Sequence, residues 1–150
     1  MIKRIQSSED ITKAIVLLQA FLKESTYKQY VELQNTQHLG KLIHAIMHSH
    51  FAWIAEVNDE PVGLLLALKE RNTWIPSLTQ LRELVWYVVP EHRTSGIGGR
   101  LFIEYCRQAE ELMNADVIQG YFTTRMDNTQ AVNLERRGFR MVEQTYLKEQ

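Results

Sequence analysis

The stretch VVPEHRTSGIGGRL, residues 88–101, differs in composition from the chain on either side of it. A run of apolar residues typical of a strand ends at Pro90, a basic turn follows, and Gly96, Gly98 and Gly99 lie within four positions. Glycines this close together, at the start of an amphipathic run, indicate a backbone that something else approaches closely. The stretch therefore predicts a strand, a tight loop and a helix in succession.

The composition limits the fold and excludes several function classes. A chain of 150 residues, with 45% hydrophobic and 23% charged residues, is typical of one globular domain over residues 1–150. The net charge of −1 gives no general attraction to nucleic acid or to an anionic membrane. One cysteine, Cys106, excludes an intrachain disulfide, and no apolar run is long enough for a membrane span. We expect a cytoplasmic protein that binds neither nucleic acid nor membrane.

Hydrophobic periodicity around the glycine stretch predicts a mixed α/β fold with the element order β-α-α-β-β-β-α-β-α-β. Strands are expected at residues 1–6, 51–57, 62–70, 81–89, 117–124 and 140–149. The first expected helix is capped by Ser7 or Ser8 and carries Ile11, Ile15, Leu18 and Leu22 on one face. Further helices are expected at 36–48, from the glycine loop to about Asn114, and at 127–138, where Gly138 closes the last one.

The glycine loop suits an anionic ligand. A glycine-rich turn into a helix directs free backbone N–H groups and the positive end of the helix dipole at one spot, which favours phosphate, and Arg93 and Arg100 add positive charge. The alternative is a plain turn whose glycines only allow helix packing. A Walker A loop fits poorly because Leu101 follows Arg100 where a Lys-Ser/Thr pair is needed. A Rossmann loop fits poorly because this loop follows the fourth predicted strand and Asp116 precedes its strand.

A third interpretation fits better. Residues 93–98, RTSGIG, match the pattern Q/R-x-x-G-x-G/A and so resemble the pyrophosphate-binding motif of the GNAT N-acetyltransferases. Residues 83–93, ELVWYVVPEHR, resemble that family's central strand, and residues 127–139, DNTQAVNLERRGF, resemble its distal helix and Gly-Phe turn. The resemblance covers nearly the whole chain. It implies a mixed sheet whose two middle strands splay apart, with acetyl-CoA in the wedge and a small-molecule or peptide amine as acceptor.

The resemblance also implies which residues would bind acetyl-CoA. The glycine loop would hold the pyrophosphate through Arg93, Thr94, Ser95, Gly96, Ile97, Gly98, Gly99 and Arg100. Tyr87, Val88 and Val89 would offer main-chain groups to the pantetheine arm. The N–H of Tyr87, four residues beyond Glu83, would polarise the thioester carbonyl. Asn128 would reach the pantetheine arm, a role compatible with its alternative as a helix N-cap.

Glu83 is the candidate base. It lies in an otherwise apolar strand, at the position where some GNAT members carry the group that takes the amine proton. The alternative is a surface-facing glutamate paired with Arg82.

The family's usual acid is a tyrosine four residues before the Gly-Phe pair, and it is missing from this sequence. Leu134 stands there when counted from Gly138, and Glu135 when counted from Asn128. We therefore expect no essential side-chain acid, and we interpret Tyr121 and Tyr146 as packing residues.

Acceptor-site candidates are Tyr27, Tyr30, Trp74 and Glu83, from segments where the family admits its acceptor, although packing explains the tryptophan equally well. His44 and His48 lie four apart on the second helix but lack a third metal ligand, so no metal is expected. The alternative function is a non-catalytic acyl-CoA sensor or partner protein of the same fold, which the missing tyrosine favours and Glu83 disfavours. A P-loop nucleotide-binding protein is a distant third. Dimers are common in the family, and a homodimer is compatible with this sequence.

Overall fold

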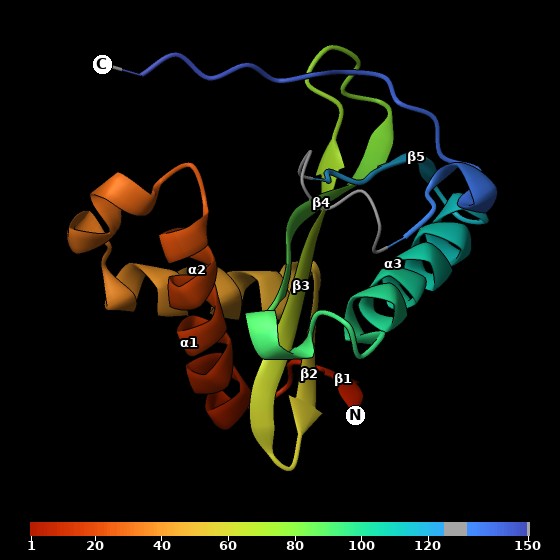
Figure 1. Ribbon diagram of the computed structural model, residues 1–150. Helices are drawn as coiled ribbons and strands as arrows, with labels where there is room; N and C mark the ends of the chain where they lie inside the picture. Colours follow the sequence, from red (N-terminus) through yellow and green to blue (C-terminus); the bar gives the residue numbers. More distant parts are fainter. Residues whose placement is uncertain (125–131, 150) are drawn as a thin grey trace.

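The computed structural model describes residues 1–124 and 132–149 and has a five-stranded mixed sheet with helices on both faces (Figure 1). The strands lie in the order β1-β2-β3-β4-β5, antiparallel except for the parallel pair β4–β5. They are β1 (Ile2–Arg4), β2 (Phe51–Val57), β3 (Glu60–Arg71), β4 (Thr79–Val88) and β5 (Val117–Tyr121). The helices are α1 (Ser8–Glu24), α2 (Thr36–Ser49) and α3 (Ile97–Met113), with short 3-10 helices η1 (Lys28–Leu33), η2 (Pro90–His92) and η4 (Glu135–Arg137). The predicted fold class is confirmed.

The sheet is buried on both faces, because α1 and α2 cover one face and α3 covers the other (Figure 1). Leu64 and Leu66 of β3 pack in the cluster on the α1–α2 side, whereas Leu65 and Ala67 pack in the cluster on the α3 side. This double burial explains why β3 is a continuous apolar run instead of an alternating one.

Local sequence signals place the element ends. Ser7 caps α1: its side chain accepts from the Asp10 N–H, and the Asp10 carboxylate accepts from the Ser7 N–H. Asn58 and Asp59 have φ of 50° and 65°, the left-handed backbone that a tight β2–β3 turn requires. In the part of the chain that the structure describes, every helix is too short or too polar to cross a lipid bilayer.

β4 and β5 splay apart, the separation expected of the two middle strands, although β5 is the edge strand of the sheet in the described residues. β4 pairs with β5 over its first half only, and the last pair is Arg82 with Tyr121. On its other edge β4 stays paired with β3 as far as Val88. Beyond Arg82, the edge of β4 that faces β5 therefore lacks a strand partner within the described residues. We call this opening the wedge and the last β4–β5 pair its apex.

The strand predicted over residues 140–149 is wrong. The structure has no strand there, and the segment runs extended across the top of the sheet toward the α1–α2 side (Figure 1). Its apolar residues come as the adjacent pairs Met141–Val142 and Tyr146–Leu147, so neither face of a strand would collect all of them. The helix predicted over 127–138 lies partly outside the described residues, and its end is η4.

Candidate active site

The glycine loop forms the N-terminus of α3. Gly96 is the N-cap, with φ of 81°, a left-handed conformation that favours glycine, and α3 begins at Ile97. The first N–H groups of a helix have no carbonyl partner within it, so they point out of its end. A Cβ atom built on Gly96 or on Gly99 would meet no atom within 4 Å. The space over this helix end is therefore open to a ligand.

Gly98 has a different role. A Cβ atom there would lie 3.5 Å from the Trp86 ring, and the Gly98 carbonyl accepts from Trp86 Nε1 at 3.0 Å. Gly98 thus fixes the loop against β4, whereas Gly96 and Gly99 leave room above the helix.

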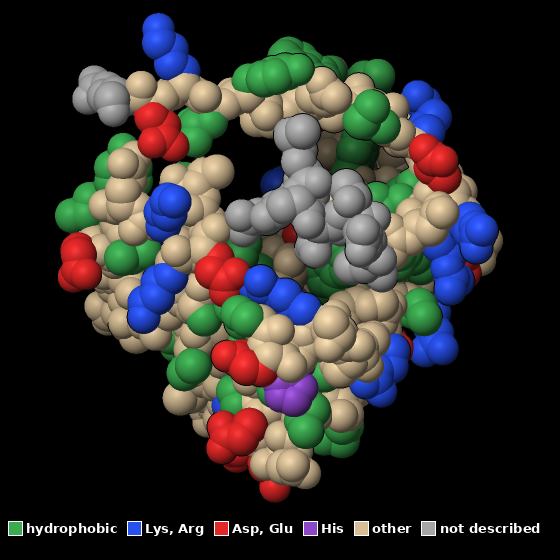
Figure 2. Space-filling model, in the orientation of Figure 1, with side chains coloured by type: hydrophobic (Ala, Val, Ile, Leu, Met, Phe, Trp, Pro, Cys, Tyr) green, Lys and Arg blue, Asp and Glu red, His purple; other side chains and the backbone are tan. Residues whose placement is uncertain are grey.

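A cavity of about 360 Å³ opens beside this helix end. The residues that line it are Gly96, Gly99, Arg100, Phe102, Ile103, Val132, Asn133, Arg136 and Arg137. Figure 2 shows Lys and Arg side chains gathered on this side of the molecule. Three arginines and a helix N-terminus together suit an anion with several negative charges. The sequence interpretation missed Arg136 and Arg137, although the pair directly before Gly138 in the resembling segment was a visible signal.

Arg93 joins three elements. Its Nε donates to the Val88 carbonyl at 2.9 Å, and its guanidinium pairs with Glu24 of α1 at 2.5 Å. The Tyr87 hydroxyl donates to the same carboxylate at 2.7 Å. Burial, and then this bond to Glu24, raise the pKa of Tyr87 to about 12. Arg93 therefore ties the glycine loop to the end of β4, while Thr94 and Ser95 are exposed.

A β-bulge interrupts β4. Leu66 lies opposite Val85, but the next residue of β3, Ala67, lies opposite Glu83. Leu84 is thus an extra residue in β4. Along a regular strand every second residue points its main-chain N–H and C=O toward the partner strand. The extra residue shifts this alternation by one, so beyond Leu84 the other set of β4 residues points toward β3.

This reversal can be followed along the strand. Antiparallel residues alternate between those whose N–H and C=O point to the partner strand and those whose groups point away. The Val89 N–H donates to the Val62 carbonyl of β3, so Tyr87 also points its N–H to β3. Trp86 and Val88 point theirs to the opposite edge, and the Val88 carbonyl accordingly accepts from Arg93.

The assignment of the Tyr87 N–H to the thioester carbonyl is therefore wrong. Counting four residues from Glu83 assumes a regular strand, in which both residues would share one orientation, and the bulge breaks that assumption. The main-chain groups that line the wedge are those of Trp86 and Val88.

Glu83 lies at the apex of the wedge, one residue beyond Arg82. It is 6% exposed, and its Oε2 accepts from the Thr123 N–H at 3.2 Å. Burial raises the pKa of Glu83 to about 7, and the Thr123 bond and the Arg82 charge lower it only in part. Arg82 instead pairs with Glu70, with 2.7 Å between Nε and Oε1. The alternative of a surface glutamate paired with Arg82 is wrong.

The three aromatic acceptor candidates come from two connections and are exposed, whereas the fourth candidate, Glu83, is buried. Tyr27 and Tyr30 belong to the α1–α2 connection and Trp74 to the β3–β4 connection, and no ring contact joins these three described side chains. Asn128 lies outside the described residues. Tyr146 is 87% exposed, so its interpretation as a packing residue is wrong.

Neither a metal site nor the usual acid is present among the residues described. Leu134 precedes η4 and offers no proton. His44 and His48 are exposed, with 3.2 Å between their Nε2 atoms. Within residues 1–124 and 132–149, no three His, Cys, Asp or Glu side chains gather as metal ligands would. Burial raises the pKa of the half-buried Cys106 thiol, as expected of an unreactive cysteine.

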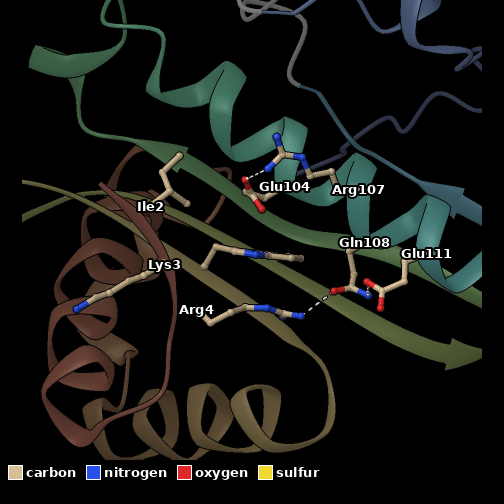
Figure 3. A pocket seen from close by; sticks show the side chains of 8 residues that line it. Ile2, Lys3, Arg4, Glu104, Arg107, Gln108 and Glu111 are labelled. Carbon is tan, nitrogen blue, oxygen red and sulfur yellow. Dashed lines mark hydrogen bonds and ion pairs between the residues drawn. The ribbon is translucent and has the colours of Figure 1, made fainter.

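A second cavity, of about 330 Å³, lies between β1, β2 and α3 (Figure 3). Arg4 crosses it to donate to Gln108 at 2.7 Å, and its guanidinium lies over the Phe51 and Trp53 rings. Acidic and basic side chains share its walls, so it favours no ligand charge. None of the predicted site residues lines it in the described part of the chain.

Several known protein structures share this fold. An aminoglycoside acetyltransferase from an uncultured soil metagenomic sample has a TM-score of 0.70 at 17% identity, covering 100% of this chain and 96% of that chain. A Trypanosoma brucei acetyltransferase has a TM-score of 0.69 at 12% identity, covering 100% and 99%. Ribosomal-protein-alanine N-acetyltransferase from Brucella melitensis biovar Abortus 2308 has a TM-score of 0.67 at 16% identity, covering 99% and 97%. These likenesses show the fold.

The family follows from the sequence itself. No curated protein matches this sequence at a significant level. The model of the acetyltransferase (GNAT) family, however, matches residues 17–139, most of the chain. The chain therefore belongs to the GNAT family of acetyltransferases.

Proposed function

We propose that this protein transfers an acetyl group from acetyl-CoA to a primary amine while both are bound in one complex. The observation that carries the proposal is Glu83. It is a buried carboxylate whose pKa burial raises to about 7, and it lies at the apex of the wedge between β4 and β5. A base with a pKa near the working pH combines a large unprotonated fraction with useful basicity.

The residues around the wedge fit acetyl-CoA. The N-terminus of α3, with Gly96 and Gly99 open above it, would hold the pyrophosphate, and Arg100, Arg136 and Arg137 would balance its charge. Trp86 and Val88 would present main-chain groups to the amides of the pantetheine arm, as an edge strand does to a peptide. When bound, acetyl-CoA supplies an activated thioester. Arg93 would help by holding the loop in place.

The chemistry assigned to this chain is proton transfer and polarisation. In the reaction, a bond forms between the amine nitrogen and the acetyl carbon, the C–S bond breaks, and its electron pair leaves on sulfur. Glu83 accepts the proton that the amine loses, directly or through one water. An N–H from Trp86 or Val88 polarises the carbonyl.

No side-chain acid is assigned to the leaving sulfur. A thiol has a pKa of about 8.5, so the thiolate can leave unprotonated where N–H dipoles stabilise it, or it can take the proton from the newly formed ammonium.

The acceptor is proposed to enter at the end of the wedge beside Glu83. Tyr27, Tyr30 and Trp74 are exposed aromatic side chains that would contact it. The structural relatives named above include aminoglycoside and ribosomal-protein-alanine acetyltransferases. A small-molecule or peptide amine is therefore proposed as the acceptor class.

The second candidate is an acyl-CoA sensor without catalytic activity, favoured by Leu134 in place of the usual tyrosine. Thiol release from acetyl-CoA, measured over a panel of amines, separates the two. Amine-dependent release supports the enzyme. Tight acetyl-CoA binding without release by any amine supports the sensor.

The test of the binding site uses Gly99, because its backbone is helical and a side chain there meets no atom. Asp in the first turn stabilises a helix, so Gly99→Asp should keep α3 folded while placing a negative charge at the pyrophosphate. Like charges in contact cost several kcal/mol, so we expect acetyl-CoA affinity to fall by about 100-fold or more in calorimetry. Gly99→Asn, the neutral control of the same shape, should lose less than about tenfold. Equal affinities of the two variants would show that the loop does not bind phosphate.

A further inference from the structure

Tyr105 of α3 is a polar residue in the middle of the core. Its side chain is fully buried, at 0% exposure. Its hydroxyl lies 2.7 Å from the Tyr121 carbonyl of β5 and 3.1 Å from the Leu81 carbonyl of β4. A hydroxyl carries one proton, so it donates to one carbonyl at a time, and the shorter contact marks Tyr121 as the main acceptor. Tyr105 thus contacts both strands that border the wedge.

The hydroxyl lies where the two strands begin to separate. Leu81 pairs with Gly120, and the next pair, Arg82 with Tyr121, is the last one. A Cβ atom on Gly120 would lie 3.1 Å from the Tyr105 hydroxyl oxygen, so the missing side chain at that position leaves room for the hydroxyl group. The Tyr105 ring is held edge-on by Phe122, with 5.0 Å between centroids. Few motions are open to this side chain.

The same two strands set the surroundings of Glu83. Glu83 follows the last paired residue of β4, and its carboxylate accepts from Thr123, which follows the end of β5. The distance between the strands at the apex therefore decides whether Glu83 stays buried and bonded to Thr123. In the described part of the chain, the groups that act on the pKa of Glu83 are the Arg82 charge from β4 and the Thr123 N–H, and the charge of Glu83 in turn acts on the Tyr105 hydroxyl of α3. Burial raises the pKa of Tyr105, so its hydroxyl keeps its proton.

We propose that Tyr105 is a positioning residue: its hydroxyl ties β5 to β4 at the apex of the wedge and so holds Glu83 in its buried place against Thr123. The proposal rests on the proposed function, in which Glu83 is the base. Tyr105 acts through Glu83 and contacts neither acetyl-CoA nor the amine. Losing the hydroxyl removes the donor to the Tyr121 carbonyl and the contact with the Leu81 carbonyl, and the strands then separate further so that water can reach the Tyr121 carbonyl.

The test is Tyr105→Phe, which keeps the ring and removes the hydroxyl. The readout is the titration midpoint of Glu83, followed by carbon NMR of protein with labelled glutamate and assigned with Glu83→Gln. Water entering the apex relieves the desolvation of the carboxylate, the largest cause of its raised pKa, and this outweighs the loss of the Thr123 bond, so we expect the midpoint to fall by about one pH unit. We also expect kcat to fall by about three- to tenfold, with its pH profile displaced in the same direction. Tyr121→Phe is the control, since that hydroxyl contacts Gln119 at the surface and should leave the midpoint unchanged.

An unchanged Glu83 midpoint in folded Tyr105→Phe would overturn the proposal. Where Tyr105→Phe fails to fold, Gly120→Ala decides, because its methyl group lies 3.1 Å from the hydroxyl oxygen and pushes it from its place while the ring remains, and a smaller fall in the midpoint is expected. Measuring the midpoint requires no acetyl transfer, so the role of Tyr105 can be tested separately from the proposed function. Wild-type protein that releases no CoA with any amine contradicts the function, whereas the shift alone decides the role of Tyr105.

Discussion

Glu56 and Glu83 have nearly equal exposed fractions in one sheet and yet opposite electrostatic surroundings, because lysine side chains cover Glu56 whereas Glu83 lies deeper in the protein. Glu56 of β2 is 5% exposed and Glu83 of β4 is 6% exposed. The carboxylate of Glu56 bonds Lys13 at 2.8 Å and lies 3.4 Å from Lys3. The Lys13 bond, more than any other contact, holds the pKa of Glu56 below its ordinary value. Glu83 accepts one backbone N–H, and burial raises its pKa to about 7.

The difference teaches that this fold can compensate a buried carboxylate and does so at one of the two positions. An uncompensated buried carboxylate destabilises a protein or keeps its proton. At Glu56 two lysines offset that cost, and the residue has a structural explanation. At Glu83 the cation that acts on the carboxylate, Arg82, is paired with Glu70 instead. A perturbed acid at the apex of a wedge is a candidate for catalysis, and this supports the proposal for Glu83.

The largest expected effect is on turnover. Glu83→Gln keeps the shape of the side chain and removes its basicity, so kcat should fall by about 10²–10⁴-fold while acetyl-CoA affinity stays nearly constant. The measurement is steady-state CoA release with an accepting amine from the panel. Glu56→Gln is the matched control and should change kcat by less than about threefold. Equal losses in the two variants would remove the distinction between the glutamates.

The second expected effect is on stability, with opposite signs at the two positions. The pKa of Glu83 is raised from an ordinary 4.5 to about 7 in the folded state. The folded protein therefore binds the Glu83 proton more tightly than the unfolded chain does. The stability that the protonated carboxyl contributes is full below pH 4.5 and is lost as pH rises through 7. Glu83→Gln cannot ionise, so relative to wild type it should gain about 2–3 kcal/mol in the free energy of unfolding between pH 5 and pH 8.

Glu56→Gln should behave in the opposite way. The lowered pKa of Glu56 means that its contribution is present above the ordinary value and is lost only at lower pH. Its variant should be less stable than wild type by about 1–2 kcal/mol at both pH 5 and pH 8. Denaturant unfolding at the two pH values checks both variants. A Glu83→Gln variant whose stability relative to wild type does not change with pH would contradict the raised pKa.

The smallest expected effect concerns Arg82. Its charge lowers the pKa of Glu83, although less than burial raises it. Arg82→Met removes that charge, so the pKa of Glu83 should rise further, by between a few tenths of a unit and about one unit. Because a base must be unprotonated to act, kcat/KM should increase with pH through about 7 in wild type. In the variant this rising limb of the pH profile should move to higher pH. A limb that moves to lower pH would contradict the assignment to Glu83.

Much of the fold could be predicted because burial on both faces leaves a strong hydrophobic pattern. The helix expected over 36–48 is α2 (Thr36–Ser49), and the strands expected at 51–57 and 62–70 are β2 and β3. The last strand was predicted from composition, but its apolar residues occur in adjacent pairs. Pairing with a neighbouring strand decides such a segment, and the local pattern does not.

The site was predictable where it depends on glycines and less so where it depends on register. The glycine loop is a local signal, and the structure places it at a helix N-terminus. The bulge at Leu84 depends on how β4 pairs with β3, so counting along β4 gave the wrong N–H. One trace existed in the sequence: Leu84 and Val85 are consecutive apolar residues, and both pack on the α1–α2 side. The Arg82–Glu70 ion pair joins β4 to β3, so it likewise could not be predicted from the sequence of β4 alone.

The most direct measurement of the central claim is the titration of both glutamates in one sample of wild-type protein. Carbon NMR of glutamate-labelled protein, assigned with Glu83→Gln and Glu56→Gln, follows the two carboxyl groups together. We predict that Glu83 titrates with a midpoint of about 7 and that Glu56 stays ionised to below its ordinary value of 4.5. A Glu83 midpoint at or below the ordinary 4.5 would show a compensated carboxylate and contradict its role as the base.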